Sequence, residues 1–381
     1  MSSRTGVSRR RALQLVGGSL SSGVVTGTAA GTDGGDDAVR VNVGYASPSG
    51  RKAAADRAEA IYHDLQIDVL TIVVDRNAIP GLRQRRDIRF VEDDVELEAI
   101  AQETPWGIDR VDAEVAHANG DTGDGVDVAI IDTGIDRDHP DLAANVGEGV
   151  TIVAGTTTLN GDDDNGHGTH CAGIADAVDN SEGVVGVSTT ATLHPVKVLS
   201  ATGTGLTSDV AKGIEYTADQ GWDVGSLSLG GGDSQTLEDA CSYAYSKNVV
   251  LVAAAGNDGP CSDCVSYPAA YSECMAVSAT SKDDSLAGFS SAGPEVELAA
   301  PGDGIYSTYL DGYATLSGTS MACPHVSGAA AQVIADGTTD NDTVRSELKD
   351  AAEDIGLSSD EAGAGLLDVA AVLRPDSSED L

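Results

Sequence analysis

Hydrophobic and polar positions alternate in short segments before residue 100 and then give way to longer, continuously apolar runs. In the first part, apolar residues at alternate positions predict strands, and one segment with a helical repeat predicts a helix. The segments are, in order, a strand in "RVNVGYA", a helix in "GRKAAADRAEAIYHDL", and strands in "DVLTIVVD" and "IRFVEDD". They predict a small α+β domain, which ends at the extended polar segment "VELEAIAQETPWG".

From residue 125 onward, apolar runs alternate with segments of helical periodicity. The runs are "GVDVAIIDTG", "TLHPVKVLS", "GSLSLGG", "NVVLVAAAGN" and "CMAVSAT", and the helical segments are "GTHCAGIADAV", "TSDVAKGIEYTADQ", "TLEDACSYAYSK" and "VSGAAAQVIAD". Continuous Val, Ile and Ala runs separated by helices are typical of a parallel sheet covered on both faces. We therefore expect an α/β fold, a doubly wound three-layer sandwich with a mostly parallel sheet. Chemistry should collect at the carboxyl ends of its strands.

The N-terminal segment "SRRRALQLVGGSLSSGVVTGTAA" combines arginines, a mildly apolar stretch and a small-residue end. This pattern predicts an export signal over residues 1–30, and Arg9, Arg10 and Leu13 are typical of the twin-arginine type. The alternative is a disordered basic tail. No apolar run reaches the roughly 18 residues that span a bilayer. We therefore expect a secreted, extracellular protein without a membrane partner once the signal is removed.

The chain is strongly acidic, with 61 Asp and Glu against 22 Lys and Arg and a net charge of −39. Residues 101–381 alone hold 47 acidic and 9 basic side chains, counted along the sequence. Such a field repels nucleic acid and anionic membranes, so neither is expected as a partner. Acidic residues scattered between apolar runs, with few lysines, are typical of a protein that works in concentrated salt, where repulsion is screened.

Six cysteines in an exported chain permit 15 complete pairings, and the sequence does not choose among them. Cys261, Cys264 and Cys274 are close together along the chain, so we expect one bridge within that group. Cys171 and Cys323 lie beside the motifs described next and are expected as free, buried thiols.

A serine, a histidine and an aspartate each lie at the start or end of a predicted helix or strand. Ser320 lies in "SGTSMACPHVSG", where small residues precede an apolar helix and expose one hydroxyl at the helix N-terminus. A serine hydroxyl is a weak nucleophile unless a base, itself oriented by a carboxylate, removes its proton. His167 in "GHGTHCAG" and Asp132 at the end of the apolar run "VAIIDTG" supply these groups. Taken singly, His167 could be a packed core histidine and Asp132 a turn aspartate.

The motifs "VAIIDTGIDRDHPDL", "GHGTHCAG", "SLSLGG", "AAAGN" and "SGTSMACPHVSG" resemble those of subtilisin-type serine proteases, the subtilases, in order and in approximate spacing. The resemblance covers residue 101 to about residue 370 and is strongest to the halophilic secreted members, the halolysins. It implies that Ser320 attacks the scissile carbonyl, that His167 takes and returns the proton, and that Asp132 orients the imidazole. It also implies that Asn257 and the backbone N–H of Ser320 stabilise the oxyanion.

The resemblance further implies that an extended substrate lies between two backbone segments, which gives main-chain hydrogen bonds for any sequence. These segments are Gly203, Thr204 and Gly205, and Ser228, Leu229 and Gly230. Ala254, Ala255 and Gly256 would form small walls of the pocket for the side chain preceding the cut. We expect this pocket to prefer a large apolar side chain. Ser266 puts that preference in doubt, because it stands where the best-known relatives have glycine.

A structural Ca²⁺ site is also implied, since oxygen ligands in this number suit that ion. The ligands would be backbone carbonyls of Val178, Glu182 and Val184, and side chains of Asn180, Asp141 and Gln102. The loop "VDNSEGV" would be an insertion in the helix after His167, and the alternative is a solvated acidic loop. Gln102 reaches such a site only after the chain is cut before it, which places maturation near Ile100–Ala101.

Two hypotheses of function result. The first is a secreted, monomeric serine endopeptidase adapted to high salt and self-processed from a precursor. Its parts would be a signal peptide (1–30), an inhibitory and folding propeptide (31–100) and a subtilisin-like catalytic domain (101–381). Its partners would be protein or peptide substrates and its own propeptide as an intramolecular inhibitor. The second is a non-enzymatic secreted binding or surface protein on a subtilase scaffold.

Overall fold

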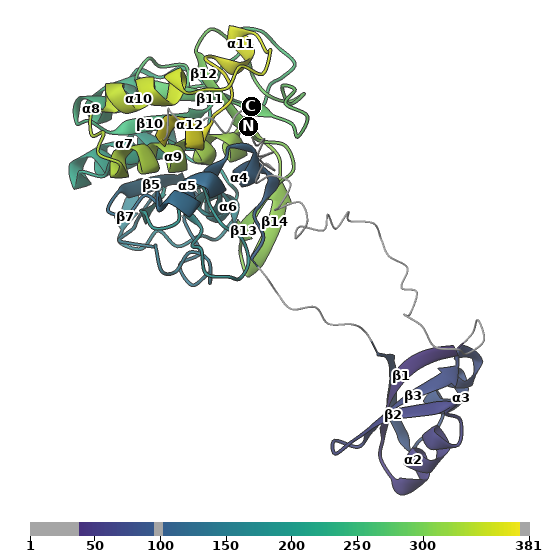
Figure 1. Cartoon of the computed structure of the whole chain (residues 1–381). Helices are drawn as coiled ribbons and strands as arrows, with labels where there is room; N and C mark the ends of the chain where they lie inside the picture. The colour runs from purple at the N-terminus through teal and green to yellow at the C-terminus, as the bar shows by residue number, and fades with distance from the viewer. Residues whose placement is uncertain (1–37, 95–101, 374–381) are drawn as a thin grey trace, which may run out of the picture. The chain divides into compact units, whose positions relative to one another are not determined.

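The computed structural model describes residues 38–94 and 102–373, coloured along the chain in Figure 1. These residues form two compact units, one within residues 1–99 and one within residues 100–381. The predicted export signal and the predicted cleavage site near Ile100–Ala101 lie outside the described residues.

The smaller unit is a four-stranded antiparallel sheet in the order β2-β3-β1-β4, packed against two helices. Its elements are β1 (Ala38–Tyr45), α2 (Pro48–Ala55), β2 (Ala60–Leu65), β3 (Val69–Asp75), a 3-10 turn (Arg76–Ala78), α3 (Ile79–Arg83) and β4 (Ile88–Asp93). Val41 and Val43 of β1 and Leu70 and Ile72 of β3 are fully buried in its core, with Leu82 of α3. Alternate residues of β1 and β3 therefore contribute to the core of this unit.

The predicted helix over "GRKAAADRAEAIYHDL" is correct only in its first half. Helix α2 begins after Ser47, whose side chain accepts a hydrogen bond from the backbone N–H of Gly50, and it ends at Ala55. Residues 60–65 instead form β2, whose side chains are all exposed. Because β2 buries no side chain, its sequence carries no apolar alternation, and its pairing with β3 determines its conformation.

The larger unit contains a mostly parallel sheet of eight strands and a two-stranded hairpin. The strands are β5 (Asp127–Asp132), β6 (Val150–Val153), β7 (Thr156–Thr158), β8 (Thr192–Lys197), β9 (Val224–Leu227), β10 (Val250–Ala254), β11 (Cys274–Thr280), β12 (Val296–Pro301), β13 (Ile305–Tyr309) and β14 (Gly312–Leu316). The helices are α4 (Trp106–Arg110), α5 (Ala113–Asn119), α6 (His167–Asp176), α7 (Thr207–Gln220), α8 (Gln235–Ser246), α9 (Thr319–Ala335), α10 (Asn341–Asp350), α11 (Ser359–Ala362) and α12 (Val369–Leu373).

The predicted three-layer α/β sandwich is confirmed. The sheet order is β12-β11-β10-β9-β5-β8-β6-β7, and only the pair β6–β7 is antiparallel. Helices α6 and α9 pack on one face and α7 and α8 on the other. Strand β5 shows why its sequence is continuously apolar: Val128 and Ile130 lie in the first core, whereas Ala129 and Ile131 lie in the second.

The topology brings three strand ends together at the carboxyl edge of the sheet. Strand β9 lies between β5 and β10, so the residues that follow these three strands are neighbours in space. Asp132 is the last residue of β5, Ser228 follows β9, and Ala255 follows β10. This is the edge at which the sequence predicts the chemistry.

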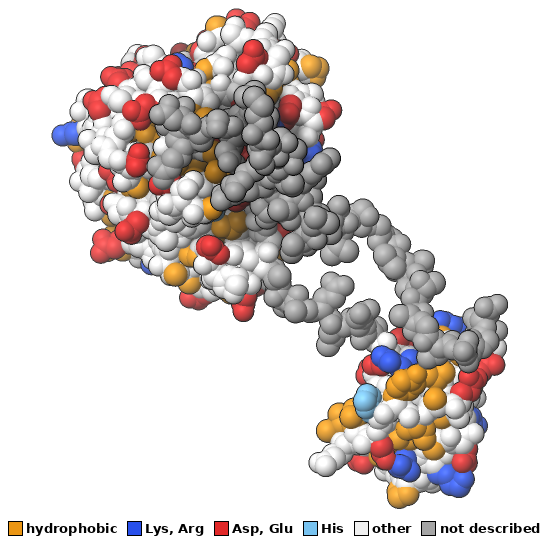
Figure 2. Space-filling view, viewed as in Figure 1, with side chains coloured by type: hydrophobic (Ala, Val, Ile, Leu, Met, Phe, Trp, Pro, Cys, Tyr) orange, Lys and Arg blue, Asp and Glu red, His pale blue; other side chains and the backbone are white. Residues whose placement is uncertain are grey.

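Acidic side chains are scattered over the visible face of the larger unit, with few basic ones among them (Figure 2). The smaller unit carries both signs of charge and an exposed apolar group on and after β2, formed by Ile61, Tyr62, Leu65 and Ile67. Within the described residues, no helix has the length and hydrophobicity needed to cross a bilayer.

Candidate active site

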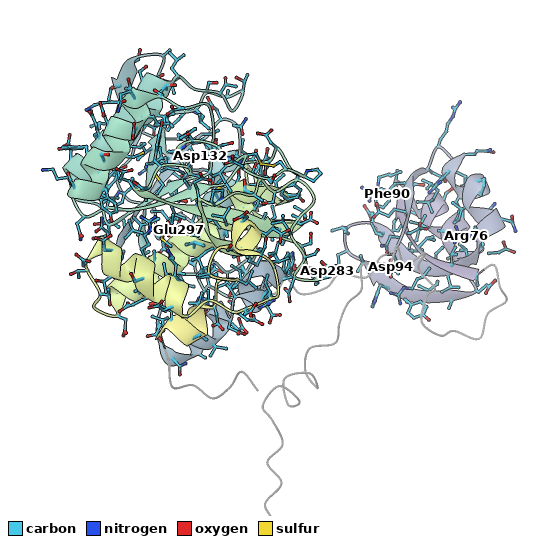
Figure 3. All side chains as sticks on the ribbon, turned by 90° about the horizontal axis from the view of Figure 1, so that it is seen from above. Arg76, Phe90, Asp94, Asp132, Asp283 and Glu297 are labelled. Carbon is cyan, nitrogen blue, oxygen red and sulfur yellow. A yellow bond between two sulfur atoms is a disulfide. The ribbon has the colours of Figure 1, made fainter. Side chains whose placement is uncertain are left out.

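Asp132 and His167 form a hydrogen-bonded pair at the carboxyl edge of the sheet. Asp132 is fully buried among the side chains around it (Figure 3), and its Oδ1 lies 2.8 Å from Nδ1 of His167. The same oxygen accepts a 2.6 Å bond from the backbone N–H of Thr133. Since a carboxylate only accepts, Nδ1 of the imidazole carries the proton and Nε2 is left to act as a base.

The electrostatics of this pair favour the charged imidazole. The negative charge of Asp132 raises the pKa of His167 above 6.5, burial opposes this shift, and the hydrogen bond and the charge of Asp163 add to it. The ring keeps 28% of its surface exposed, so a substrate can reach it. A histidine in this setting can accept a proton and hold it while the reaction proceeds.

The loop before His167 is held by Asp163, which the sequence analysis did not single out. Its carboxylate accepts bonds from the backbone N–H groups of Asn165, Gly166 and Thr169 and from the hydroxyl of Thr169. Burial alone would raise the pKa of Asp163, but these bonds keep it below its ordinary value. The signal was the acidic turn "DDDNG" before a helix, a common way of satisfying free N–H groups.

Thr133 and Gly168 fix where helix α6 begins relative to strand β5. The Thr133 hydroxyl accepts a 2.8 Å bond from the backbone N–H of Gly168. A side chain at position 168 would place its Cβ 2.2 Å from the carbonyl oxygen of Gly134, so only glycine allows this approach. The two segments are thereby close enough for the contact between Asp132 and His167.

Ser320 is the second residue of α9, as the sequence predicts. Its Oγ donates to the carbonyl oxygen of Ser228 at 3.2 Å. Pro324, four residues later, has no N–H, so the Ser320 carbonyl lacks its helical partner. That oxygen instead accepts bonds from the Ser228 hydroxyl at 2.8 Å and the Cys171 thiol at 3.4 Å. The motif's proline therefore anchors the start of α9 to the end of β9 and to α6.

Asn257 and the Ser320 backbone N–H border the same small space. Oδ1 of Asn257 accepts bonds from the backbone N–H of Thr319 at 2.9 Å and from its hydroxyl at 3.1 Å. This orients the amide, and a Cβ at Gly318 would lie 3.5 Å from Asn257 Nδ2 and 3.7 Å from Ser320 N. Because residue 318 is glycine, no side chain occupies this position close to both nitrogens.

A cleft of about 470 Å³ joins His167 and Ser320 to both predicted substrate segments. Its lining includes Gly203, Thr204, Gly205, Ser228, Leu229 and Gly230. The sequence analysis did not predict the residues that extend it, which are Asn165, Leu199, Thr207, Val210, Leu237 and Tyr267. These side chains come from several elements and share no motif, so only the fold brings them together.

A profile of the Subtilase family matches residues 123–366. The chain belongs to the subtilase family. Its sequence is 43% identical over 318 residues to an alkaline protease of Shouchella clausii, covering 82% of each chain. It is 46% identical over 277 residues to subtilisin Savinase of Lederbergia lenta, covering 72% of this chain and 100% of that one. It is 40% identical over 311 residues to alkaline elastase YaB of a Bacillus strain, covering 81% and 80%.

The family and the assembled groups make this subtilase a serine endopeptidase. The alternative hypothesis was a non-enzymatic binding or surface protein on a subtilase scaffold. The contact between Asp132 and His167, and the presence of both His167 and Ser320 in the lining of one cleft, argue against that alternative.

The residues predicted to form the walls of a pocket for the side chain before the cut are not among those that line this cleft. Ala254 and Ala255 are buried, and the backbone N–H of Ser266 donates to the Ala255 carbonyl at 2.8 Å. A Cβ at Gly256 would lie 2.5 Å from Ser266 Oγ, and one at Gly230 would lie 3.0 Å from Ser266 Cβ. Ser266 therefore fills space between Gly230 and Gly256 that a glycine at position 266 would leave open.

The subtilase contains one disulfide among its described residues, Cys261–Cys264, within the group of three in which a bridge was expected. Cys171 and Cys323 are buried free thiols, as are Cys241 and Cys274.

Cys171 lies with Asp132 and His167 in a cluster whose ligand atoms are within 4.8 Å of one another, the one such cluster in residues 38–94 and 102–373. Burial, then the charge of Asp132, raises its pKa well above the ordinary value, so the thiol stays protonated and donates to Ser320.

The segments predicted to bind calcium meet beyond the end of α6. The loop "VDNSEGV" is not an insertion in a helix, because α6 ends at Asp176 and no helical segment follows the loop directly. Gln102 Nε2 lies 2.8 Å from the carbonyl oxygen of Val178 and 3.1 Å from that of Val184. Asp141 accepts bonds from the Val184 N–H and from Asn180 Nδ2.

Glu182 lies in the same loop, and its backbone N–H donates to Asn180 Oδ1 at 2.8 Å. The segment after the predicted cleavage site runs along this loop: the N–H of Gln102 donates to the Ser181 carbonyl and that of Glu103 to the Gly183 carbonyl. The six predicted ligands thus come from three segments, 102–103, 141 and 178–184, that meet in space.

Proposed function

We propose that this subtilase is a secreted endopeptidase that hydrolyses peptide bonds with Ser320 as nucleophile, His167 as general base and acid, and Asp132 as the group that orients it. The observation that carries the proposal is the 2.8 Å contact between His167 Nδ1 and the buried Asp132 carboxylate, in a cleft that also exposes Ser320. A nucleophile and a carboxylate-oriented histidine in one cleft are the parts that acyl transfer needs.

In the first step, Ser320 Oγ turns from the Ser228 carbonyl toward the scissile carbonyl carbon, and Nε2 of His167 takes its proton. Asp132 stabilises the imidazolium that forms, and the charge moves to the carbonyl oxygen of the substrate. That oxygen lies in the space bordered by Asn257 Nδ2 and Ser320 N, which stabilises it with two hydrogen bonds. His167 then gives its proton to the leaving amine, and a water molecule hydrolyses the acyl-enzyme by the same steps.

The substrate would lie extended between residues 203–205 and residues 228–230, which border the cleft on two sides. The side chain before the cut would enter the pocket walled by Ala254, Ala255, Gly256 and Ser266. Because Ser266 fills part of that space, the pocket accepts a large apolar side chain less freely than one with glycine at this position. Proteins and peptides are the substrates, and we expect the enzyme to act as a monomer.

We infer that the chain is made as a precursor of three parts: signal peptide (1–30), propeptide (31–100) and catalytic domain (101–381). In support, residues 38–94 form a compact unit with a hydrophobic core of its own, apart from the unit that holds the cleft. The arginines of the N-terminal segment support twin-arginine export. The propeptide would assist folding and inhibit the protease until Ser320 cleaves the chain near Ile100–Ala101.

The self-processing proposal is tested by purifying the parent precursor and its Ser320→Ala variant in the absence of other proteases. The parent should yield a product shortened by about the propeptide length, with a mature N-terminus within a few residues of Ala101. Ser320→Ala should stay at precursor size, and addition of a small amount of active parent should then convert it. A mature product from isolated Ser320→Ala would refute self-processing.

We further infer a structural Ca²⁺ site formed by the side chains of Gln102, Asp141 and Asn180 and the backbone carbonyls of Val178, Glu182 and Val184. The arrangement fits an oxygen-ligated cation, because the Gln102 amide faces two carbonyl oxygens and Asn180 faces a buried carboxylate. Amide O and N are assigned from hydrogen bonds, and with O turned inward both side chains become ligands. The ion would then hold residues 102–103 against the loop and stabilise the folded protease.

We also infer that the enzyme is adapted to concentrated salt, as the resemblance to halolysins suggests. The excess of 47 acidic over 9 basic residues in 101–381 supports this inference. Several of the basic residues are already engaged: Arg110 pairs with Asp284 and Glu353, and Lys197 pairs with Asp164. Most carboxylates are therefore left to repel one another unless dissolved ions screen them.

A further inference from the structure

The Cys261–Cys264 disulfide lies in the loop that separates two parts of the proposed catalytic site. Asn257, the proposed oxyanion donor, stands four residues before Cys261, and Ser266, in the proposed pocket wall, stands two residues after Cys264. Residues 258–265 therefore connect the proposed oxyanion donor at one end to the proposed pocket wall at the other, and Asn257 is also held from outside the loop by the N–H and hydroxyl of Thr319.

Backbone hydrogen bonds attach both arms of this loop to residues 289–292. On the first arm, the N–H of Gly259 donates to the Phe289 carbonyl at 2.8 Å, and that of Asp258 donates to the Ser291 hydroxyl. On the second arm, the N–H of Cys264 donates to the Ala292 carbonyl at 3.0 Å. Between these arms, at residues 260–263, the S–S bond is the connection that closes the turn.

A cross-link between residues three apart has little effect on the unfolded chain. The entropy that a disulfide removes from the unfolded state grows with the length of the loop it closes, and this loop is among the shortest that occur. A contribution to global stability is therefore a weak reason for this bond. Its main physical effect is on the native loop, where it restricts the residues that lead directly into the pocket.

The contacts of Ser266 show how that restriction reaches the substrate. Ser266 is held between Gly230 and Gly256, close enough that a Cβ on either would lie within 3.0 Å of it, and its N–H donates to the Ala255 carbonyl. In the proposed pocket, the position of Ser266 would therefore set the depth available to the side chain before the cut. A large side chain would extend toward Ser266 and a methyl group would not, so displacement of Ser266 would affect the two unequally.

We propose that the Cys261–Cys264 disulfide is a specificity-determining cross-link, which holds Ser266 in place so that the pocket distinguishes large from small side chains before the cut. The inference rests on the proposed function, since it concerns the same pocket. A reductant can reach this disulfide, because Cys261 and Cys264 are partly exposed. The other four cysteines of the described residues are buried free thiols and offer no second bond to reduce.

The test uses the mature protease at high salt and two peptide substrates that differ only in Phe or Ala before the cut. The disulfide is removed in two ways, by Cys261→Ser/Cys264→Ser and by treating the parent with a trialkylphosphine. In that reaction the phosphine becomes the oxide with oxygen from water, and each sulfur takes one proton. The phosphine-treated double variant is the matched control, because only buried thiols remain. Active sites are counted with a burst-titrating ester, and kcat and KM are measured separately.

We expect the ratio of kcat/KM for Phe over Ala to fall about three-fold or more in both the double variant and the reduced parent. The change should be mainly in KM, with the number of titratable sites unchanged and no phosphine effect on the double variant. An unchanged ratio with faster thermal inactivation would overturn the inference and leave the bond a simple stabiliser, and so would loss of the titratable sites. A parent that hydrolyses neither peptide would instead refute the proposed function.

Discussion

His167 Nδ1 lies 2.8 Å from Oδ1 of Asp132, and this carboxylate has no exposed surface. Because a buried charge acts through few intervening water molecules, Asp132 influences His167 more strongly than a surface carboxylate would. It is the first cause of the raised pKa of the imidazole. The contact between the end of β5 and the start of α6 therefore affects the pKa of His167, and with it the pH range in which the enzyme is active.

Asp132→Asn should change the pH profile as well as the rate. In the parent, kcat/KM should rise with pH as His167 loses its proton, with a midpoint above 6.5, because its pKa is raised. Without the negative charge that midpoint should move down, while kcat falls about 10⁴-fold through the wrong tautomer. The measurement is kcat/KM against pH for both proteins. A midpoint that is the same in both would show that Asp132 does not determine the pKa of His167.

Asn257→Ala should lower kcat about 10²–10³-fold and leave KM nearly unchanged, because the lost hydrogen bond forms mainly in the transition state. That loss corresponds to about 2.7–4 kcal/mol. The exposed Asn119→Ala in α5 is the matched control and should retain the parent rate. The measurement is kcat and KM of each variant on one peptide. An effect confined to KM would mean that Asn257 binds substrate without stabilising the oxyanion.

Calcium removal should shorten the active lifetime without altering the chemistry. At fixed high salt, EGTA should accelerate thermal inactivation of the parent several-fold, because the ion stabilises only the folded state. Gln102→Ala should inactivate at a similar rate with and without EGTA, whereas Asp179→Asn, an exposed residue of the same loop outside the ligand set, should behave like the parent. Parent inactivation rates that do not respond to EGTA would argue against a metal at this loop.

Dilution of salt should unfold the mature enzyme. The Debye length rises from about 3 Å at 1 M to about 30 Å at 0.01 M, so at low salt nearly every carboxylate of the domain repels the others. Salt also strengthens apolar burial, and domain stability is typically only about 5–15 kcal/mol. Activity and circular dichroism should both decline within hours after dilution from about 4 M to about 0.1 M NaCl. Persistence of both, with calcium chelated, would show that the acidic surface serves solubility alone.

The sequence predicted the inner strands of the central sheet, β11, β10, β9, β5 and β8, because parallel strands covered on both faces are rich in apolar residues. It predicted α7 over its full length, since residues 207–220 carry a clear helical period. It did not predict β6, β7, β12, the β13–β14 hairpin or α10–α12. Strand β7 is exposed at the sheet edge and β14 is only partly buried, so neither has a strong apolar pattern.

The proposed catalytic groups were found because each lies in a short motif at a strand or helix end. The groups that hold them were missed, because their contacts join segments far apart in sequence. Asp163 was one of several acidic residues in a turn, and its role follows only from the four hydrogen bonds it accepts. The extension of the cleft by Leu199, Leu237 and Tyr267 likewise depends on the packing of separate elements.

The central claim is that Ser320 is the nucleophile, and peptide hydrolysis by Ser320→Ala beside the parent tests it most directly. Both proteins are matured by the same active protease, which is then removed. They should give the same circular dichroism spectrum at high salt. The exposed Ser359→Ala in α11 controls for loss of a hydroxyl. We predict that Ser320→Ala loses about 10⁶-fold in kcat and does not react with an active-site serine reagent, whereas Ser359→Ala matches the parent. Folded Ser320→Ala that still hydrolyses peptide at a rate near that of the parent would contradict the account.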